Sequence, residues 1–178
     1  DYKVVDIKID VPQSLRVSEA NVFFPIADIV WHGDPLGDRH EQVKKIFEEA
    51  FAKGTASLKG KEGVIVEATV TRFHALTPKA RYTTGGEHTL HFILTVIDAK
   101  TGQIVDGPRP IVASVHASGG QRAMEEEDVG LTQKVVIENR LAEVILAELT
   151  APKPVAAPAE DQAVSRQDFS PTDLNIVE

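Results

Sequence analysis

The stretch VIVEATVTRF, residues 64–73, alternates apolar and polar side chains, a pattern typical of a β-strand with one buried face. Successive side chains of a strand point to opposite sides, so the apolar ones gather on one face. That face consists of Val64, Val66, Ala68 and Val70. The opposite face carries Glu67, Thr69 and Thr71. This stretch therefore predicts a half-buried strand in the middle of the chain.

Extended segments follow it. TLHFILTVID, residues 89–98, has the same period and runs into the turn-forming stretch DAKTGQIV, which predicts a hairpin. IVASVHA, residues 111–117, continues the extended pattern after Pro108 and Pro110. Proline suits the edge or the start of a strand rather than the middle of a sheet. We expect three consecutive strands here, the last of them at an edge.

Two segments before residue 64 are also predicted to be extended. YKVVDIKIDV, residues 2–11, places Val5, Ile7, Ile9 and Val11 on one face and ends before Pro12. Residues 22–31 are mixed in character and are interrupted by Pro25, so only ADIVW, residues 27–31, is predicted to form a short strand.

Two segments have the helical period. In residues 39–54 the apolar side chains recur every three or four positions, and Gly54 is a suitable end. Residues 131–149 form a second amphipathic pattern, with the acidic run of residues 125–128 expected at its start, where the helix dipole favours negative charge. The order of elements predicts an α+β fold, an antiparallel sheet of about four to five strands with two helices packed on one face.

The composition changes near residue 150. We assign residues 1–150 to one α+β globular domain and residues 151–178, rich in proline and alanine, to a flexible linker or tail. The last ten residues, FSPTDLNIVE, regain apolar side chains and are either a frayed end or a short docking peptide.

Charge and composition exclude several classes. The net charge is −8 and no basic run of five occurs, which argues against nucleic acid as a partner. No apolar stretch approaches the roughly 20 residues of a membrane span. The chain has no cysteine, so disulfides, thiolate zinc sites and cysteine nucleophiles are excluded.

The densest group of polar residues is WHGDPLGDRH, residues 31–40. In a structural interpretation, Asp38 caps the following helix together with Glu41, and the glycines and proline form turns. In a second interpretation, His32, Asp34 and His40, with help from His88 or His91, bind a divalent cation, although their spacing matches no established zinc motif. In a third, a partner protein contacts this loop. The partner-binding candidates are Trp31, Asp34, Asp38 and Arg39.

Other polar residues offer weaker signals. His88 and His91 would point to opposite faces of a strand, and the paired glycines of TTGGEH and ASGGQRA match no nucleotide-binding motif. We therefore predict no catalytic residue and no cofactor.

Three linked stretches carry a resemblance. They are DIVWHGDPLGDRHEQVKKIFEEAF, VTRFHALTPKARYTTGGEHTLHFILTVIDAKTG and ASGGQRAMEEEDVGLTQKVVIENRLAEVI. The chain resembles, over residues 1–150, a family of uncharacterised lipoproteins from alphaproteobacteria, a domain-of-unknown-function group. It is similar, more loosely, to small accessory lipoproteins of the cell envelope. The resemblance implies a precursor with a signal sequence and a lipid-bearing cysteine before Asp1, neither of which this chain contains.

On these grounds we expect a non-catalytic periplasmic domain, tethered to a membrane by an N-terminal lipid, that binds another envelope protein as part of a cell-envelope assembly. Two alternatives stay open. One is a metal-dependent hydrolase that uses His32, Asp34 and His40, and the other is a carrier of a small lipid-like ligand held between sheet and helices.

Overall fold

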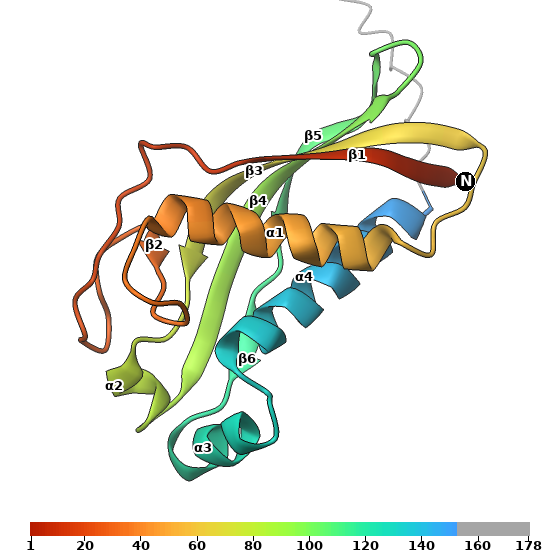
Figure 1. Ribbon diagram of the computed structural model, residues 1–178. Helices are drawn as coiled ribbons and strands as arrows, with labels where there is room; N and C mark the ends of the chain where they lie inside the picture. Colours follow the sequence, from red (N-terminus) through yellow and green to blue (C-terminus); the bar gives the residue numbers. More distant parts are fainter. Residues whose placement is uncertain (153–178) are drawn as a thin grey trace, which may run out of the picture.

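The computed structural model describes residues 1–152, which form a mixed α+β fold (Figure 1). Its elements are β1 (Tyr2–Asp10), β2 (Ile29–Val30), α1 (Arg39–Thr55), β3 (Glu62–His74), α2 (Pro78–Arg81), β4 (Gly86–Asp98), β5 (Ile104–Val112), β6 (Val115–Ala117), α3 (Gly120–Asp128) and α4 (Gln133–Thr150). No helix in this part of the chain is both long enough and apolar enough to cross a membrane.

The strands form one six-stranded sheet with the order β1-β3-β4-β5, to which β2 adds beside β3 and β6 beside β4. The antiparallel pairs β3/β4 and β4/β5 confirm the predicted hairpin. The bounds predicted for the last strand are wrong: β5 begins at Ile104 and contains both prolines, and residues 111–117 are divided between β5 and the separate strand β6. β5 lies at an edge of the sheet, a position that tolerates proline. The prediction of an antiparallel sheet is wrong for β1 and β2, which run parallel to β3. The reason is that the chain crosses over through α1 before it enters β3, so β3 runs in the same direction as β1 and β2.

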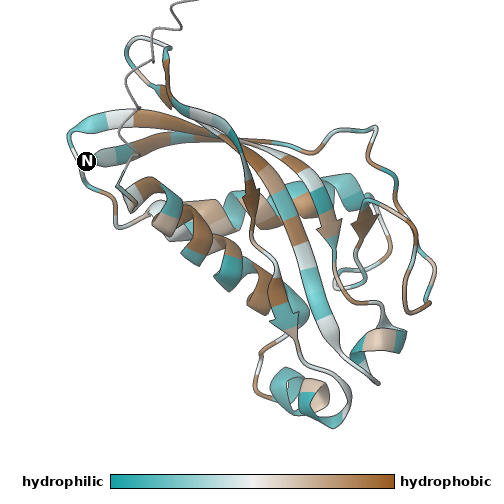
Figure 2. Cartoon of the chain, turned by 180° about the vertical axis from the view of Figure 1, so that it is seen from behind, coloured by the Kyte–Doolittle hydropathy of each residue, from teal (hydrophilic) through white to brown (hydrophobic). Residues whose placement is uncertain are grey.

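Both long helices cover the same face of the sheet, as predicted; from behind, the strands lie in front of them (Figure 2). Aromatic rings of α1, Phe47 and Phe51, pack against Phe73 of β3 and Phe92 of β4, all at most 1% exposed. These rings fill the space in which a lipid-like ligand would lie, and nothing in this part of the structure supports the carrier alternative.

The two short helices were not predicted. The acidic run of residues 125–128 closes α3 instead of opening α4. Gly130, with φ of 85°, forms the turn that separates the two helices, since this left-handed conformation suits glycine.

The face predicted for β1 is wrong at one position. Its register against β3 shifts between Val4 and Asp6, and this β-bulge turns Val5 out of the core, leaving it 54% exposed. Ile9 and Val11 are buried as expected. A bulge adds one residue to a strand and so reverses the side-chain alternation beyond it.

The edge beside β3 is interrupted. β1 pairs with β3 up to Thr69, and β2 pairs with Phe73 and His74. Residues 11–28, which we call the excursion, therefore leave this edge of the sheet and return to it. This excursion lies at the end of the molecule opposite the N-terminus (Figure 1). The predicted linker and docking peptide fall almost wholly within residues 153–178, which lie outside the described residues.

Candidate functional site

The loop of residues 31–38 closes over its own tryptophan. Trp31 is fully buried and packs edge-on against Phe73, with ring centroids 5.5 Å apart. Its indole Nε1 donates a hydrogen bond of 2.8 Å to Asp34 Oδ2. A Cβ added at Gly33 would lie 2.3 Å from the Trp31 ring, so the ring occupies the space in which a side chain would stand.

Polar contacts tie this loop to distant parts of the chain. Asp34 Oδ1 accepts a hydrogen bond of 2.7 Å from Lys134 Nζ of α4. Arg39, only 5% exposed, donates to the backbone oxygens of Asp34 and Pro35 and forms an ion pair of 2.8 Å with Glu19 of the excursion. These bonds hold the loop against α4 on one side and against the excursion on the other.

The carboxyl group of Asp34 is held ionised by this arrangement. Burial raises its pKa, but the hydrogen bonds from Lys134 and Trp31, together with the charges of Lys134 and Arg39, outweigh burial and leave the pKa below its ordinary value. Asp34 is therefore a charged link between the loop and α4.

Asp38 caps α1 as predicted, because its Oδ1 accepts a hydrogen bond of 3.1 Å from the backbone nitrogen of Glu41. Of the four partner-binding candidates, Asp38 is exposed, Asp34 is half-buried, and Trp31 and Arg39 are buried. Partner binding by these residues stays a prediction, and the two buried side chains would act only by shaping the loop.

The structure does not bring the predicted metal ligands together around one ion. His40 Nε2 lies 3.0 Å from the backbone oxygen of Leu15, and both oxygens of Asp34 are engaged. His32 Nε2 is buried without a hydrogen-bond partner. His88 is buried, whereas His91 lies on the outer face of β4, as expected. Within residues 1–152, no group of three or more histidine, aspartate or glutamate side chains is placed to hold a metal ion.

The most exposed apolar side chains lie in the excursion, in a segment for which the sequence predicts no role. We call residues 22–26, VFFPI, the apolar loop. Phe24 is 89% exposed and Ile26 is 92% exposed, while Pro25 between them is buried. Leu36, 81% exposed, is a third such side chain in the neighbouring loop. The available signal was an apolar run that contains a proline and so cannot continue as a central strand.

The backbone on both sides of these side chains is anchored. Thr77 Oγ1 donates 2.7 Å to the oxygen of Val22, and Arg72 donates 3.3 Å to the oxygen of Ala27. His74 Nε2 lies 3.0 Å from the oxygen of Pro25. The backbone nitrogen of Lys79 donates 2.8 Å to Asn21 Oδ1. The chain thus holds Phe24 and Ile26 outward on a backbone fixed by β3 and by α2 and its cap.

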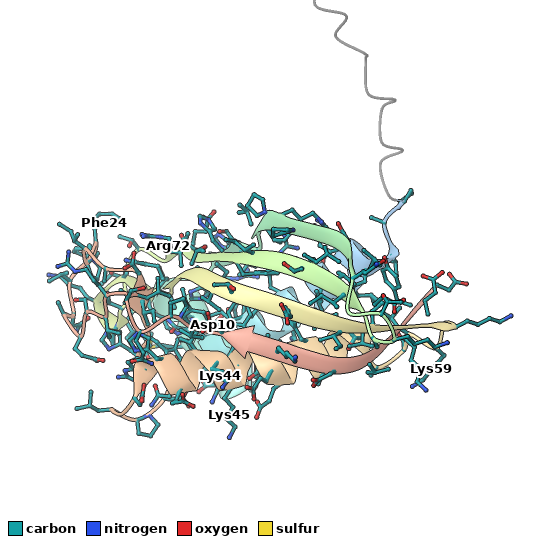
Figure 3. The ribbon with its side chains drawn as sticks, turned by 90° about the horizontal axis from the view of Figure 1, so that it is seen from above. Asp10, Phe24, Lys44, Lys45, Lys59 and Arg72 are labelled. Carbon is teal, nitrogen blue, oxygen red and sulfur yellow. The ribbon has the colours of Figure 1, made fainter. Side chains whose placement is uncertain are left out.

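Two cations border the apolar loop. The Lys79 ammonium lies 4.8 Å from the centroid of the Phe23 ring. Arg72 lies at the same end of the molecule as Phe24, and Lys59, next to the N-terminus, lies at the other (Figure 3). An exposed apolar centre with a charged rim is the usual composition of a protein-binding surface.

Comparisons with known proteins give a limited result. No curated protein matches the chain. The chain is similar to the crystal structure of a "putative lipoprotein" from Caulobacter crescentus CB15, with 14% sequence identity, a TM-score of 0.30, and coverage of 63% of this chain and 86% of that one. A TM-score this low does not establish a common fold. The sequence profile of a family of unknown function, DUF6778, matches residues 2–165, and this chain therefore belongs to the DUF6778 family.

Proposed function

We propose that this chain is a non-catalytic periplasmic domain of an alphaproteobacterial lipoprotein that serves as a binding or accessory subunit of a cell-envelope assembly. In its native form it is tethered by a lipid on a cysteine ahead of Asp1. Its docking surface is the apolar loop, and its occupant is another envelope protein.

The observation that carries this proposal is the anchored display of Phe24 and Ile26. Two large apolar side chains about 90% exposed raise the free energy of the unbound protein, and burying them against a partner removes that cost. Because the backbone is already held by hydrogen bonds from β3 and by the contacts at α2, little conformational entropy is lost on binding.

Charge and position favour a protein over a membrane surface. The chain carries a net charge of −8, which repels anionic lipid headgroups. The apolar loop lies beyond the far end of β1, whose nine residues span about 30 Å. A lipid attached ahead of Asp1 would therefore leave the loop pointing away from the membrane that holds the lipid.

The two cations beside the apolar loop make it selective for a partner with acidic side chains. Lys79 and Arg72 flank the loop, so the complementary surface has an apolar pocket for Phe24 and acidic side chains around it. Aromatic side chains seated in such pockets commonly dominate binding energy.

The test places a photo-crosslinking amino acid at position 24 of the lipidated precursor in an exporting bacterium, with position 129 as the control. Val129 is 76% exposed, at the end of α3. We expect one envelope protein to crosslink at position 24 and not at position 129. With that protein purified, the double variant Phe24→Ser, Ile26→Ser should weaken binding at least about tenfold, whereas Val129→Ser leaves it unchanged.

Three results would overturn the proposal. They are equal binding by the double variant and the wild type, crosslinking of position 24 only to lipid or to a second copy of this chain, and vesicle flotation of the unlipidated protein that depends on Phe24.

A further inference from the structure

A groove runs along the outer edge of β1, between this strand and α1. Residues 3–7 of β1 form one wall, and the last turns of α1, from Glu48 onward, form the other. Leu58 and Lys59, in the loop after α1, lie at the end nearest the N-terminus. We call this hollow the edge groove. Figure 3 shows β1 at the margin of the sheet, with α1 beside it and Lys59 near the end where β1 begins. The groove has a volume of about 470 Å³, within the range of roughly 300–1,000 Å³ that is usual for binding sites.

The strand side of the edge groove is open for pairing. β1 is the last strand on its side of the sheet, and within residues 1–152 no strand pairs with its outer edge. The backbone groups of such an edge are a template for another extended segment, and natural proteins often cover them. The β-bulge turns Val5 toward the groove, where this side chain is 54% exposed. Half-buried side chains of Val4, Ile7 and Leu58 line the groove as well. The groove therefore offers both a strand edge and an apolar surface.

Small side chains keep the groove open on the side of α1. Glu48, Ala52 and Thr55 share one face of the helix, since they follow each other at intervals of four and three positions. Ala52 and Ala56 are exposed and contribute only methyl groups to the wall. An occupant can therefore approach the helix closely.

The chain leaves the described part of the structure next to this groove. A second hollow lies between the end of α4 and the N-terminus, and residues 149–151 line it together with Leu58 and Lys59. These two residues line both hollows and separate them as a ridge. The residues that follow Pro152 therefore start one ridge away from the edge groove.

The length and the sequence of residues 153–178 suit this position. Residues 153–172 can span up to about 65 Å, far more than the passage over the ridge requires. They are followed by DLNIV, residues 173–177, which has three large apolar side chains and neither proline nor glycine. These five residues match the five residues of β1 that line the groove, because each set spans about 16 Å when extended.

Charge favours the same occupant. A chain that crosses the ridge brings Asp173 first to the end of the groove where Lys3 and Lys59 lie. Residues 174–177 are uncharged, which suits the part of the groove lined by Asp6 and Glu48. A segment tethered to its own site has an effective concentration in the millimolar range, so modest contacts suffice for binding.

We propose that residues 173–177 of this chain bind in the edge groove as an added extended segment that runs in the same direction as β1. Leu174 and Ile176 lie on the same side of an extended chain and cover Val5 and its apolar neighbours. The proposal is independent of the docking surface, because no residue of the apolar loop lines the groove.

The experiment uses a spin label on the isotope-labelled full chain. The chain has no cysteine, so a single Asn175→Cys substitution accepts a nitroxide label at one position only. We expect the label to broaden the backbone amide NMR signals of Val5, Asp6 and Ala52. The signals of the apolar loop, which lies beyond the far end of β1, should keep their width.

A mixed sample shows which copy supplies the segment. Isotope-labelled chain without a spin label is combined with spin-labelled chain that carries no isotope. We expect no broadening at the edge groove in this sample, because the segment binds to its own chain.

Variants locate the binding. Val5→Glu should reduce the broadening at Asp6 at least about fivefold, since the segment would bury an unpaired carboxylate. The matched control is Val112→Glu, at a side chain that is 65% exposed on β5 at the opposite edge of the sheet, and the broadening should be unchanged. The double variant Leu174→Ser, Ile176→Ser leaves residues 1–152 unaltered and should reduce the broadening to a similar extent.

Three outcomes overturn the proposal. The first is the absence of broadening at the edge groove. The second is broadening that is as strong in Val5→Glu, or in the double variant, as in the chain that carries only the label. The third is equal broadening in the mixed sample, which would assign the groove to the segment of a second copy.

Discussion

Two loops near the end of β3 place an aromatic side chain in opposite surroundings. The loop of residues 31–38 turns Trp31 inward onto Phe73 and pairs its polar groups with α4 and the excursion. The apolar loop turns Pro25 inward and leaves Phe24 and Ile26 outside, although its backbone is equally well anchored. A rigid backbone can therefore bury an aromatic ring or present it, and the first arrangement stabilises the fold while the second suits binding.

The sharpest test of this comparison is Trp31→Ala. Loss of a fully buried indole should lower the free energy of unfolding by about 3–5 kcal/mol, through lost burial and the cavity left against Phe73. Denaturant unfolding followed by circular dichroism measures it. A loss below about 1 kcal/mol would mean that the loop is not held by its tryptophan.

Gly33→Ala comes next. The added methyl would collide with the Trp31 ring, and we expect a loss of about 1–3 kcal/mol in the free energy of unfolding. Gly37→Ala is the matched control, because its added methyl would lie 3.1 Å from the end of the Gln42 side chain and 3.7 Å from the backbone oxygen of Pro35, both farther than the Trp31 ring lies from a methyl at position 33. Thermal unfolding of both variants measures the two losses of stability, and equal losses would contradict the crowding at Gly33.

Asp34→Asn keeps the shape of the loop and removes the charge that Lys134 contacts. We expect a loss of about 1 kcal/mol at neutral pH. The folded-state pKa of Asp34 lies below the ordinary value of 3.8, so its stabilisation is fully present above about pH 4 and disappears as the pH falls through the folded-state pKa. Unfolding curves of wild type and variant should converge on acidification. A constant gap down to pH 2 would rule out this charge as the cause.

The smallest expected effect is on the other loop. Phe24→Ser and Ile26→Ser, alone or together, should change the free energy of unfolding by less than about 0.5 kcal/mol, since both side chains are already in water. Denaturant unfolding of these variants and of Trp31→Ala under the same conditions compares the two losses of stability directly. A loss comparable to that of Trp31→Ala would show that Phe24 packs within the fold rather than outside it.

Much of the secondary structure could be predicted because its signals are local. The span of α1 and its Asp38 cap depend on residues within one turn of each other, and the hairpin of β4 and β5 depends on the turn between them. The bulge at Val5 and the parallel pairing of β1 carried no such signal. Both depend on how β1 meets β3, about 60 residues further along the chain.

The candidate site was predicted less well. The sequence singles out Trp31 by its residue type, yet its burial depends on Phe73 and on Lys134, which lies 100 residues from Asp34. No local pattern predicts the exposure of the apolar loop, because an apolar run is expected to be buried. Its exposure results from anchors in β3 and around α2, about 50 residues away in sequence.

The sequence by itself determined the periods of the strands and long helices, the cap of α1, the turn of the hairpin and membership of the DUF6778 family. Only the tertiary structure decided the direction of β1, the burial of Trp31, the display of Phe24 and Ile26, and the groove between β1 and α1. The physical reason is the distance along the chain over which each interaction acts. Dihedral preferences and capping act over a few residues, whereas burial and pairing depend on side chains that meet only when distant segments pack together.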